Sequence, residues 1–500
     1  MTAPSSHDPL GLEEAPSSIR TMARLTNRQV DAIRGVLHRG RYRDRVLKVM
    51  KGSVQEPDHG LVDLFHRGRS LERAAASRAL APLALETWAA AGLIRLEDTC
   101  VRPAIRLTPY RDLLVTSDHD WDVNASANPN AVMGLTGSSL WLARFTIRRP
   151  VRRTLDLGTG TGIQAMLASR HSERVVAVDL NPRALRLAEF NAQLNGIENI
   201  EFVKGDLFEA AGKRRFNLVV CNPPFSISPA SACLYRDNAM EGDDFARRLV
   251  QTLPGLLRKG GYAQIICNWI ERADEDWFSG PAGWLRGLGS DAWIVRGRST
   301  APSDYARTWL QNYETGDSSE RHRQWLEYYA HLGVGSIGSG VVTLRRRKAG
   351  RNWLRVDGSQ PAIVGEAGVH LHQGFQLRDY LDSRSDKALA GDCLRVAPDV
   401  RLTREAISDR EGWRPQPASV RLMRGLTFST HVDPRVQQIL VRCNGQVPLG
   451  ALLKEVAVGA GGDCSLIEAA LLDSVRKLIA LGFLHPVGTP AETTTAKSRS

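Results

Sequence analysis

The sequence lacks the features that mark membrane, secreted and zinc-stabilised proteins. No stretch holds about 18 consecutive apolar residues, so no segment is typical of a transmembrane helix. The first residues, MTAPSSHDPLGLEEAPSS, have neither a basic n-region nor an apolar core, so we expect no secretory signal there. Seven scattered cysteines include no CxxC pair, which argues against a structural zinc. We therefore expect a cytoplasmic protein with reduced thiols, no membrane contact and no metal.

Lysine is scarce, because only 10 of the 66 basic residues are lysines, yet the formal net charge is +12. Such a basic balance favours a polyanionic partner, for example a nucleic acid. The charge is concentrated in residues 34–51, where Asp44 is the one acid. Two interpretations of this Arg-rich helix stay open, namely contact with nucleic acid and an ordinary solvated helix face. Its basic residues are Arg34, Arg39, Arg41, Arg43, Arg45, Lys48 and Lys51.

A chain of 500 residues is too long for a single hydrophobic core, so several domains are expected. Residues 1–20 and 487–500 are polar and are predicted to be disordered tails. Residues 21–107 predict helices followed by a small hairpin, which is typical of a winged-helix-like domain. Residues 108–349 alternate between strands and helices. Residues 350–486 predict a C-terminal α+β domain that closes on a second winged-helix-like module, and the sequence does not indicate its role.

Two local patterns define the predicted N-terminal domain. Thr26 and Gln29 have the spacing of a capping box at the start of a helix. A second helix is predicted over residues 79–91. Short strands are predicted within residues 93–100 and 103–109, and they would form the hairpin.

The middle of the chain predicts a doubly wound parallel sheet, because apolar, β-branched runs alternate there with amphipathic segments. Ligands of such sheets bind at the carboxyl ends of the strands. Asn181 is the predicted N-cap of one helix and Pro182 its first residue. Strands are expected at 154–158, 175–179, 200–203, 216–221, 262–267, 292–296 and 340–345, and helices near 162–171, 183–195 and 243–258.

A glycine-rich loop, Asp156-Leu-Gly158-Thr159-Gly160-Thr-Gly162, follows the first of these strands and opens a helix. Glycines allow a tight turn and a close approach of the backbone to a ligand, and the helix N-terminus favours anionic groups. Loops that bind dinucleotides are nearly identical, but the GxGxG spacing favours a different adenosyl ligand.

Two acidic residues follow the next two strands. Asp179 can accept both hydroxyl protons of a ribose, and the alternative is that it caps the next helix. Asp206 can accept the exocyclic amine of an adenine, and the alternative is an ordinary turn residue. Leu180 and Leu207, which adjoin these acids, are included in the expected cofactor site.

Four segments together resemble the class I S-adenosylmethionine-dependent methyltransferases: DLGTGTG, VVAVDLNPRAL, KGDLF and NLVVCNPPF. The last is similar to the Asn/Asp-Pro-Pro-aromatic motif of the N-methyltransferases. That group modifies exocyclic amines of nucleic-acid bases, such as guanine N2 in ribosomal RNA, and the glutamine side chain of release factors. The resemblance covers about residues 108–347. It implies S-adenosylmethionine as cofactor and a Rossmann-like seven-stranded sheet with an antiparallel final strand, expected at residues 340–345.

The Asn222-Pro223-Pro224-Phe225 corner has a chemical rationale. A planar amine or amide nitrogen is a poor nucleophile because its lone pair is delocalised. The Asn222 side-chain oxygen and the Pro223 carbonyl can accept its two N–H hydrogens, which would favour a pyramidal nitrogen and aim its lone pair. Pro224 restricts the backbone of Pro223, and Phe225 can stack on the planar acceptor. The corner is thus predicted to be a two-acceptor clamp, and Asn222 is also expected to border the cofactor.

RNA, either ribosomal or transfer RNA, is the leading expected substrate because of the net charge, the aromatic residue and the flanking domains. The alternatives are a protein glutamine, a small-molecule amine, and a binding module without activity. The segment Gly134–Trp141 resembles family elements that cover the cofactor. Tyr235–Asp237 is interpreted either as part of a substrate lid or as a surface loop. His370 and His372 are predicted on an extended stretch without a third metal ligand.

Overall fold

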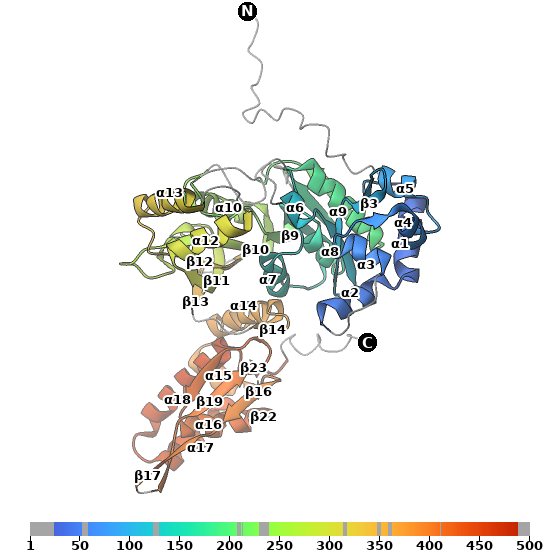
Figure 1. Cartoon of the computed structure of the whole chain (residues 1–500). Helices are drawn as coiled ribbons and strands as arrows, with labels where there is room; N and C mark the ends of the chain where they lie inside the picture. The colour runs from blue at the N-terminus through green and yellow to red at the C-terminus, as the bar shows by residue number, and fades with distance from the viewer. Residues whose placement is uncertain are drawn as a thin grey trace, which may run out of the picture. The chain divides into compact units, whose positions relative to one another are not determined.

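In the computed structural model the chain forms two compact units (Figure 1). The first unit comprises residues 1–140 and 150–356, and the second comprises residues 141–149 and 357–500. The predicted domain limits stay a prediction. The structure describes residues 25–52, 59–123, 130–207, 212, 214–229, 240–313, 318–347, 352–358, 363–410 and 412–488.

Eight strands of the described chain form one sheet, in the order β13-β11-β12-β10-β9-β6-β7-β8. β6 to β10 pair in parallel, whereas β12 is antiparallel to both β10 and β11. The Rossmann-like α/β fold is confirmed, with its antiparallel strand, but β13 adds an eighth strand to the seven predicted. The strands span Val151–Leu157 (β6), Ser172–Asp179 (β7), Ile200–Lys204 (β8), Phe216–Cys221 (β9), Leu257–Glu271 (β10), Ser290–Thr300 (β11), Ser336–Arg346 (β12) and Leu354–Asp357 (β13).

Helices cover both faces of this sheet, and β7 shows why. Its residues are apolar on both sides: Val176 and Val178 share a core with helix α10, whereas Val175 and Ala177 pack with α8. A strand buried on both faces appears in the sequence as a continuous apolar run. The helices span Ile163–Ser169 (α8), Pro182–Leu194 (α9) and Asp244–Leu256 (α10).

The described residues between 25 and 103 form five helices and the small sheet β1-β3-β2, the N-terminal part of the first unit. The predicted capping box is present, because Gln29 N donates to Thr26 Oγ1 and Thr26 N donates back to Gln29 Oε1. These elements span Asn27–Arg39 (α1), Tyr42–Met50 (α2), Gly60–Phe65 (α3), Leu71–Glu72 (β1), Arg73–Leu80 (α4), Leu85–Ala90 (α5), Ile94–Leu96 (β2) and Cys100–Pro103 (β3).

Two predicted helices of this part are wrong. The Arg-rich helix over residues 34–51 is two helices, because the backbone turns at Arg41, whose φ is +47°. The helix predicted over residues 79–91 is also interrupted, because α4 ends at Leu80 and α5 begins at Leu85. Pro82 lies in this gap; it lacks an amide hydrogen and disfavours helical backbone at the residue before it.

Helix α9 ties the N-terminal part to the large sheet through an asparagine ladder. The hairpin strand β5 (Leu113–Ser117) pairs on one side with β4 (Arg106–Tyr110). On β5, Leu114 N and O bond to Asn195 Oδ1 and Nδ2 at 2.9 and 2.8 Å. Thr116 N and O bond in the same way to Asn191, at 2.8 and 3.1 Å.

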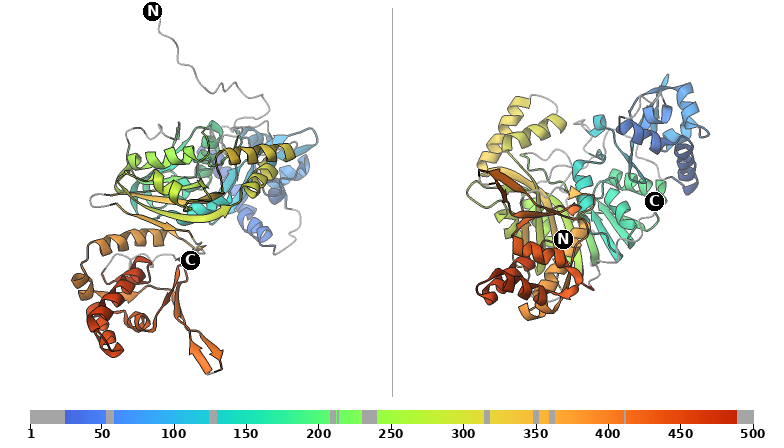
Figure 2. Two further views of the ribbon diagram at one scale, coloured as in Figure 1. Left: turned by 90° about the vertical axis from the view of Figure 1, so that its left-hand side faces the viewer. Right: turned by 90° about the horizontal axis from the view of Figure 1, so that it is seen from below.

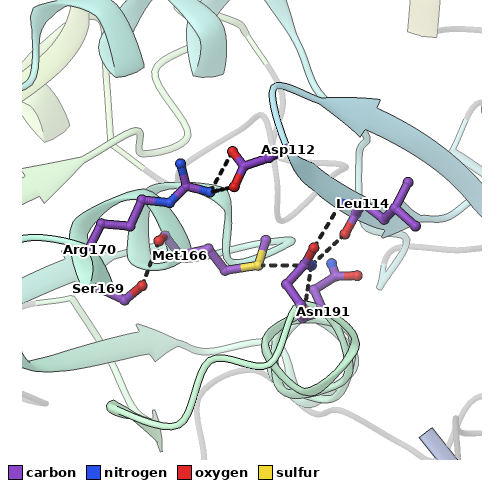
Figure 3. Close-up of polar contacts among 7 residues, drawn as sticks. Asp112, Leu114, Met166, Ser169, Arg170 and Asn191 are labelled. Atoms are coloured by element: carbon purple, nitrogen blue, oxygen red, sulfur yellow. Dashed lines mark hydrogen bonds and ion pairs between the residues drawn. The ribbon is translucent and has the colours of Figure 1, made fainter. Parts of the chain in front are cut away.

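The geometry of the ladder follows from the rise per residue of an α-helix and of a β-strand. Residues four apart on a helix rise about 6 Å, and residues two apart on a strand advance about 6.8 Å. Two asparagines four apart therefore imitate a neighbouring strand. Figure 3 shows the contacts around Leu114, Met166 and Asn191, with the ion pair between Arg170 and Asp112 beside them, both N···O distances being 2.7 Å.

The described residues of the second unit form helices and four small sheets, with a core rich in leucine, valine and isoleucine side chains. The hairpin of β17 (Ala406–Asp409) and β18 (Gly412–Pro415) extends from the rest of this unit (Figures 1 and 2). His370 and His372 lie on a helix, so the prediction of an extended stretch is wrong. The helices span Gly368–Asp382 (α14), Asp386–Gly391 (α15), Pro434–Arg442 (α16), Leu449–Ala460 (α17) and Cys464–Ala480 (α18).

Helix α7 (Gly137–Phe145) begins in the first unit and ends in the second.

Among the described helices, none combines the length and the apolar character that crossing a bilayer requires.

Candidate functional site

The carboxyl ends of four parallel strands bring the predicted motifs to one edge of the sheet. Leu157 at the end of β6 pairs with Val178 of β7 and with Cys221 of β9, and Asp179 pairs with Lys204 of β8. The segments that follow these strands therefore leave the sheet at neighbouring positions. They carry the glycine loop and the predicted polar residues, at the edge where this fold binds ligands.

The glycine loop requires its glycines. Gly158, Gly160 and Gly162 have φ values of +68°, +53° and +80°, which side-chain-bearing residues rarely adopt. A Cβ added at Gly158 would lie 3.8 Å from the backbone oxygen of Asn222 and 3.8 Å from Leu207 Cδ2. The loop, the Asn222 corner and the turn after β8 therefore surround the same space.

Asp156 forms hydrogen bonds with the glycine loop and with the helix that follows it. Its Oδ2 accepts hydrogen bonds from Thr159 Oγ1 at 2.6 Å and from Ala165 N at 3.0 Å. The side chain is almost fully buried, and this burial raises the pKa of Asp156 to about 7, although the two hydrogen bonds oppose the shift. Asp156 therefore fixes the shape of the loop, and its predicted contact with the cofactor stays a prediction.

Asp179 is half-buried at the end of β7, next to the glycine loop. Its Oδ2 accepts Gly160 N at 2.8 Å and its Oδ1 accepts Asn181 N at 2.9 Å, while burial raises the pKa of Asp179. A carboxylate has about four acceptor positions, so acceptor capacity remains for a ligand. Asn181 caps α9, as predicted, through a 2.9 Å bond from Arg183 N. The capping role considered for Asp179 is therefore taken by its neighbour.

Two leucines and a second acid complete this end of the site. Leu180 is 43% exposed, which is unusual for leucine, and it follows Asp179 directly. Asp206 is exposed and Leu207 is half-buried in the turn after β8. Carboxylates beside apolar side chains fit a nucleoside, which presents hydroxyl and amine hydrogens next to a flat ring. The residues present therefore fit an adenosyl cofactor.

Asn222 has an unusual pattern of contacts. Its Nδ2 donates to Ser138 Oγ at 3.4 Å and to Ser139 Oγ at 3.3 Å. Its Oδ1 is buried and has no hydrogen-bond partner among the described residues. Gln164 Nε2 holds the Ser139 carbonyl at 2.7 Å, which anchors the serines. A buried acceptor without a donor is costly, so its presence here indicates a site for a ligand N–H.

The two serines were not predicted to contact the corner, although their segment, Gly134–Trp141, was expected near the cofactor. Of the other corner residues, Pro223 is buried, whereas Pro224 and Phe225 are half-buried. Tyr235–Asp237 lies outside the described residues.

The fold and this edge of the sheet define a methyltransferase of the α/β class. The family profile described as "Methyltransferase small domain" matches residues 135–274. A second profile, described as "Domain of unknown function (DUF7782)", matches residues 372–486 in the second unit. This match and the relatives below support a class I S-adenosylmethionine-dependent methyltransferase of the N-methyltransferase group, with S-adenosylmethionine as the cofactor.

Curated relatives match this same region. The release factor glutamine methyltransferase of Escherichia coli is 45% identical over 127 residues, covering 25% of this chain and 43% of that protein. The ribosomal protein uL3 glutamine methyltransferase of Bradyrhizobium diazoefficiens is 34% identical over 149 residues, covering 27% and 47%. The chain thus spans about half the length of the curated relatives it matches.

Among solved structures, a methyltransferase from Pyrococcus furiosus is 13% identical and covers 43% of this chain and 89% of that one. The TM-score is 0.28.

Proposed function

We propose that the protein transfers a methyl group from S-adenosylmethionine to the side-chain amide nitrogen of a glutamine in another protein. The observation that carries this proposal is the buried, unpartnered Oδ1 of Asn222, which a donated amide hydrogen would satisfy. The named relatives, which methylate glutamine, support the same acceptor.

The glycine loop and the two acids would hold the cofactor. Asp179 has acceptor positions left for the ribose hydroxyls, and Asp206 can accept the exocyclic amine of the adenine. Leu180 and Leu207 offer apolar surface to the flat ring. When bound, S-adenosylmethionine supplies an electrophilic methyl group on its sulfonium.

The corner would hold the acceptor. Asn222 Oδ1 accepts one N–H of the primary amide, and the Pro223 carbonyl accepts the other. With both hydrogens held, the nitrogen lone pair is directed away from the two acceptors and toward the methyl group. Phe225 covers the planar amide. The bound cofactor would supply the methyl group to this nitrogen, and the proton that the nitrogen then carries in excess would pass to water.

The expectation that the acceptor is an RNA base is not confirmed. Part of the basic segment that favoured it has structural contacts: Arg34 donates to the carbonyls of Leu194 and Gln193, at 3.1 and 2.6 Å. Arg45 donates to the carbonyl of Gly40, and Arg41 lies 3.6 Å from an Asp44 oxygen. These contacts favour the alternative in which the segment is an ordinary part of the folded surface.

Labelled methyl transfer to separated protein, RNA and small-molecule fractions tests the proposal. We expect the label in protein, and hydrolysis followed by mass spectrometry should identify it as N5-methylglutamine. Asn222→Ala should lower the labelling of the protein fraction about 100-fold. Label in RNA would overturn the proposal and restore the RNA base as acceptor, and label only among small molecules would favour a small amine.

A further inference from the structure

A helical hairpin is inserted between the last two long strands of the sheet. It consists of α12 (Pro302–Tyr313) and α13 (Ser318–His331) and connects β11 to β12. Thr300, at the end of β11, pairs with Ile337, at the start of β12. Because β11 is antiparallel to β12, as β10 is, β11 runs in the same direction as the parallel strands. The hairpin therefore leaves the sheet at the edge that carries the Asn222 corner.

Two tyrosines of this hairpin hold one residue just beyond the corner. Ile227 N donates to the Tyr305 hydroxyl at 3.3 Å, and the Tyr329 hydroxyl donates to the Ile227 carbonyl at 2.9 Å. Asn268 Nδ2, from β10, donates to the same Tyr305 hydroxyl at 2.7 Å. The backbone of Ile227 is thus bound on both of its polar groups by side chains from two helices.

The surroundings make this contact rigid. Ile227 is 1% exposed and belongs to a separate apolar core with Tyr305, Tyr329, Trp325 and Ile337. Burial raises the pKa of Tyr305 and of Tyr329, so both phenols keep their protons at neutral pH. Buried hydroxyls that are fully bonded to backbone groups fix the position of that backbone.

The corner is consequently fixed at both of its ends. Cys221 is the last residue of the central strand β9, and Ile227 is held by the tyrosines. Only residues 222–226 lie between them, and two of these are prolines with a fixed φ. A short segment with anchored ends and restricted dihedrals has few available conformations.

We propose that Tyr305 and Tyr329 are positioning residues for the methyl acceptor, and that the α12–α13 hairpin is the support that aims the Asn222 clamp. This inference rests on the proposed methyl transfer to an amide nitrogen. A small displacement of a group that orients a reactant lowers turnover strongly, even when binding elsewhere is intact. Loss of the hairpin contacts should therefore lower turnover but not cofactor affinity, because the loops after β6, β7 and β8 hold the cofactor.

The test uses Tyr305→Phe and Tyr329→Phe in the full-length protein, because each removes one hydroxyl and keeps the aromatic ring in the core. Tyr42→Phe is the matched control: its buried hydroxyl also donates to a backbone carbonyl, that of Leu107 at 2.7 Å, but in the N-terminal part. For each variant we would measure kcat, cofactor affinity by calorimetry, and hydrogen–deuterium exchange of residues 221–229.

We expect each hairpin variant to lower kcat about tenfold or more, with cofactor affinity within about threefold. Exchange at the Ile227 amide should accelerate about tenfold in Tyr305→Phe, because its acceptor is gone. Tyr42→Phe should change neither kcat nor the exchange rate of the Ile227 amide. Unchanged kcat in both hairpin variants, with or without faster exchange, would overturn the inference while leaving the proposed function intact. Absence of any transfer by the wild type would refute the proposed function itself, and the inference would fall with it.

Discussion

Asn222→Ala separates the chemistry of the corner from its contribution to stability. The substitution removes the unpartnered Oδ1 and the Nδ2 that reaches two serine hydroxyls. It changes no residue assigned to the cofactor loops. Function and folding should therefore respond in different ways.

The expected magnitudes follow from the contacts. Burying an acceptor without a donor costs roughly 1–3 kcal/mol, and Asn222→Ala relieves that cost. The substitution also loses the two serine contacts, at 3.3 and 3.4 Å, which offsets part of that gain. The loss of side-chain packing offsets the rest, so the free energy of unfolding should change by less than about 1 kcal/mol. Turnover should fall about 100-fold, which corresponds to about 2.7 kcal/mol in the transition state.

Asn191→Ala provides the contrast, because Asn191 is buried and fully bonded. It accepts from Thr116 N and Oγ1 at 2.8 and 2.6 Å and donates to the carbonyls of Thr116 and Thr161. The same substitution there leaves several buried groups without partners and should cost about 3 kcal/mol or more.

Urea denaturation of both variants, calorimetry with S-adenosylmethionine and a methyl-transfer assay measure these quantities. Cofactor affinity of Asn222→Ala should stay within about threefold of the wild type. If this variant retains its turnover, the clamp does not hold the acceptor. If it loses as much stability as Asn191→Ala, then Oδ1 is satisfied in the folded protein and the argument from an unpartnered acceptor is wrong.

Two further predictions concern the acids of the site. Asp179→Ala should weaken S-adenosylmethionine binding by ~1.5–3 kcal/mol, because it removes the ribose acceptor and the bond to Gly160 N; unchanged affinity by calorimetry would mean that the ribose is held elsewhere. The pKa of Asp156 is about 7 in the folded protein and about 3.9 in an unfolded chain, so between those values the unfolded chain binds fewer protons. The free energy of unfolding should therefore fall as pH rises from about 4 to 7 by more in the wild type than in Asp156→Asn, and parallel curves from urea titrations would contradict the pKa shift.

The parts of the fold that could be predicted are those where local composition decides the structure. The run FNLVVC predicts a strand over residues 216–221, and β9 spans Phe216–Cys221. Such a strand is buried on both faces, so it can be predicted from its own apolar run without knowing which strands lie beside it. The same is true of Asn181 and Pro182, whose capping and first-turn positions depend only on nearby backbone.

The predictions are wrong where the backbone turns inside a segment with a helical pattern. The break in the basic segment depends on the left-handed conformation of Arg41, which no residue type at that position requires. The break in the helix predicted over residues 79–91 was visible in Pro82, whose effect on helices is general.

The support of the corner was not predictable in this way, because it is made by contacts across the chain. Tyr305 and Tyr329 lie 78 and 102 residues from Ile227 in sequence. Only the folded sheet places the insertion between β11 and β12 beside the loop after β9. The serines that reach Asn222 are likewise 84 and 83 residues away from it.

The asparagine ladder on α9 restricts how the sequence can change in length. The ladder works because four residues of helix and two of strand advance by nearly the same distance. One residue inserted between Asn191 and Asn195 would rotate one amide by about 100° around the helix axis, away from β5. One residue inserted between Leu114 and Thr116 would turn one of them to the opposite face of the strand. Insertions and deletions at either side would therefore detach the β4–β5 hairpin from helix α9, which follows β7.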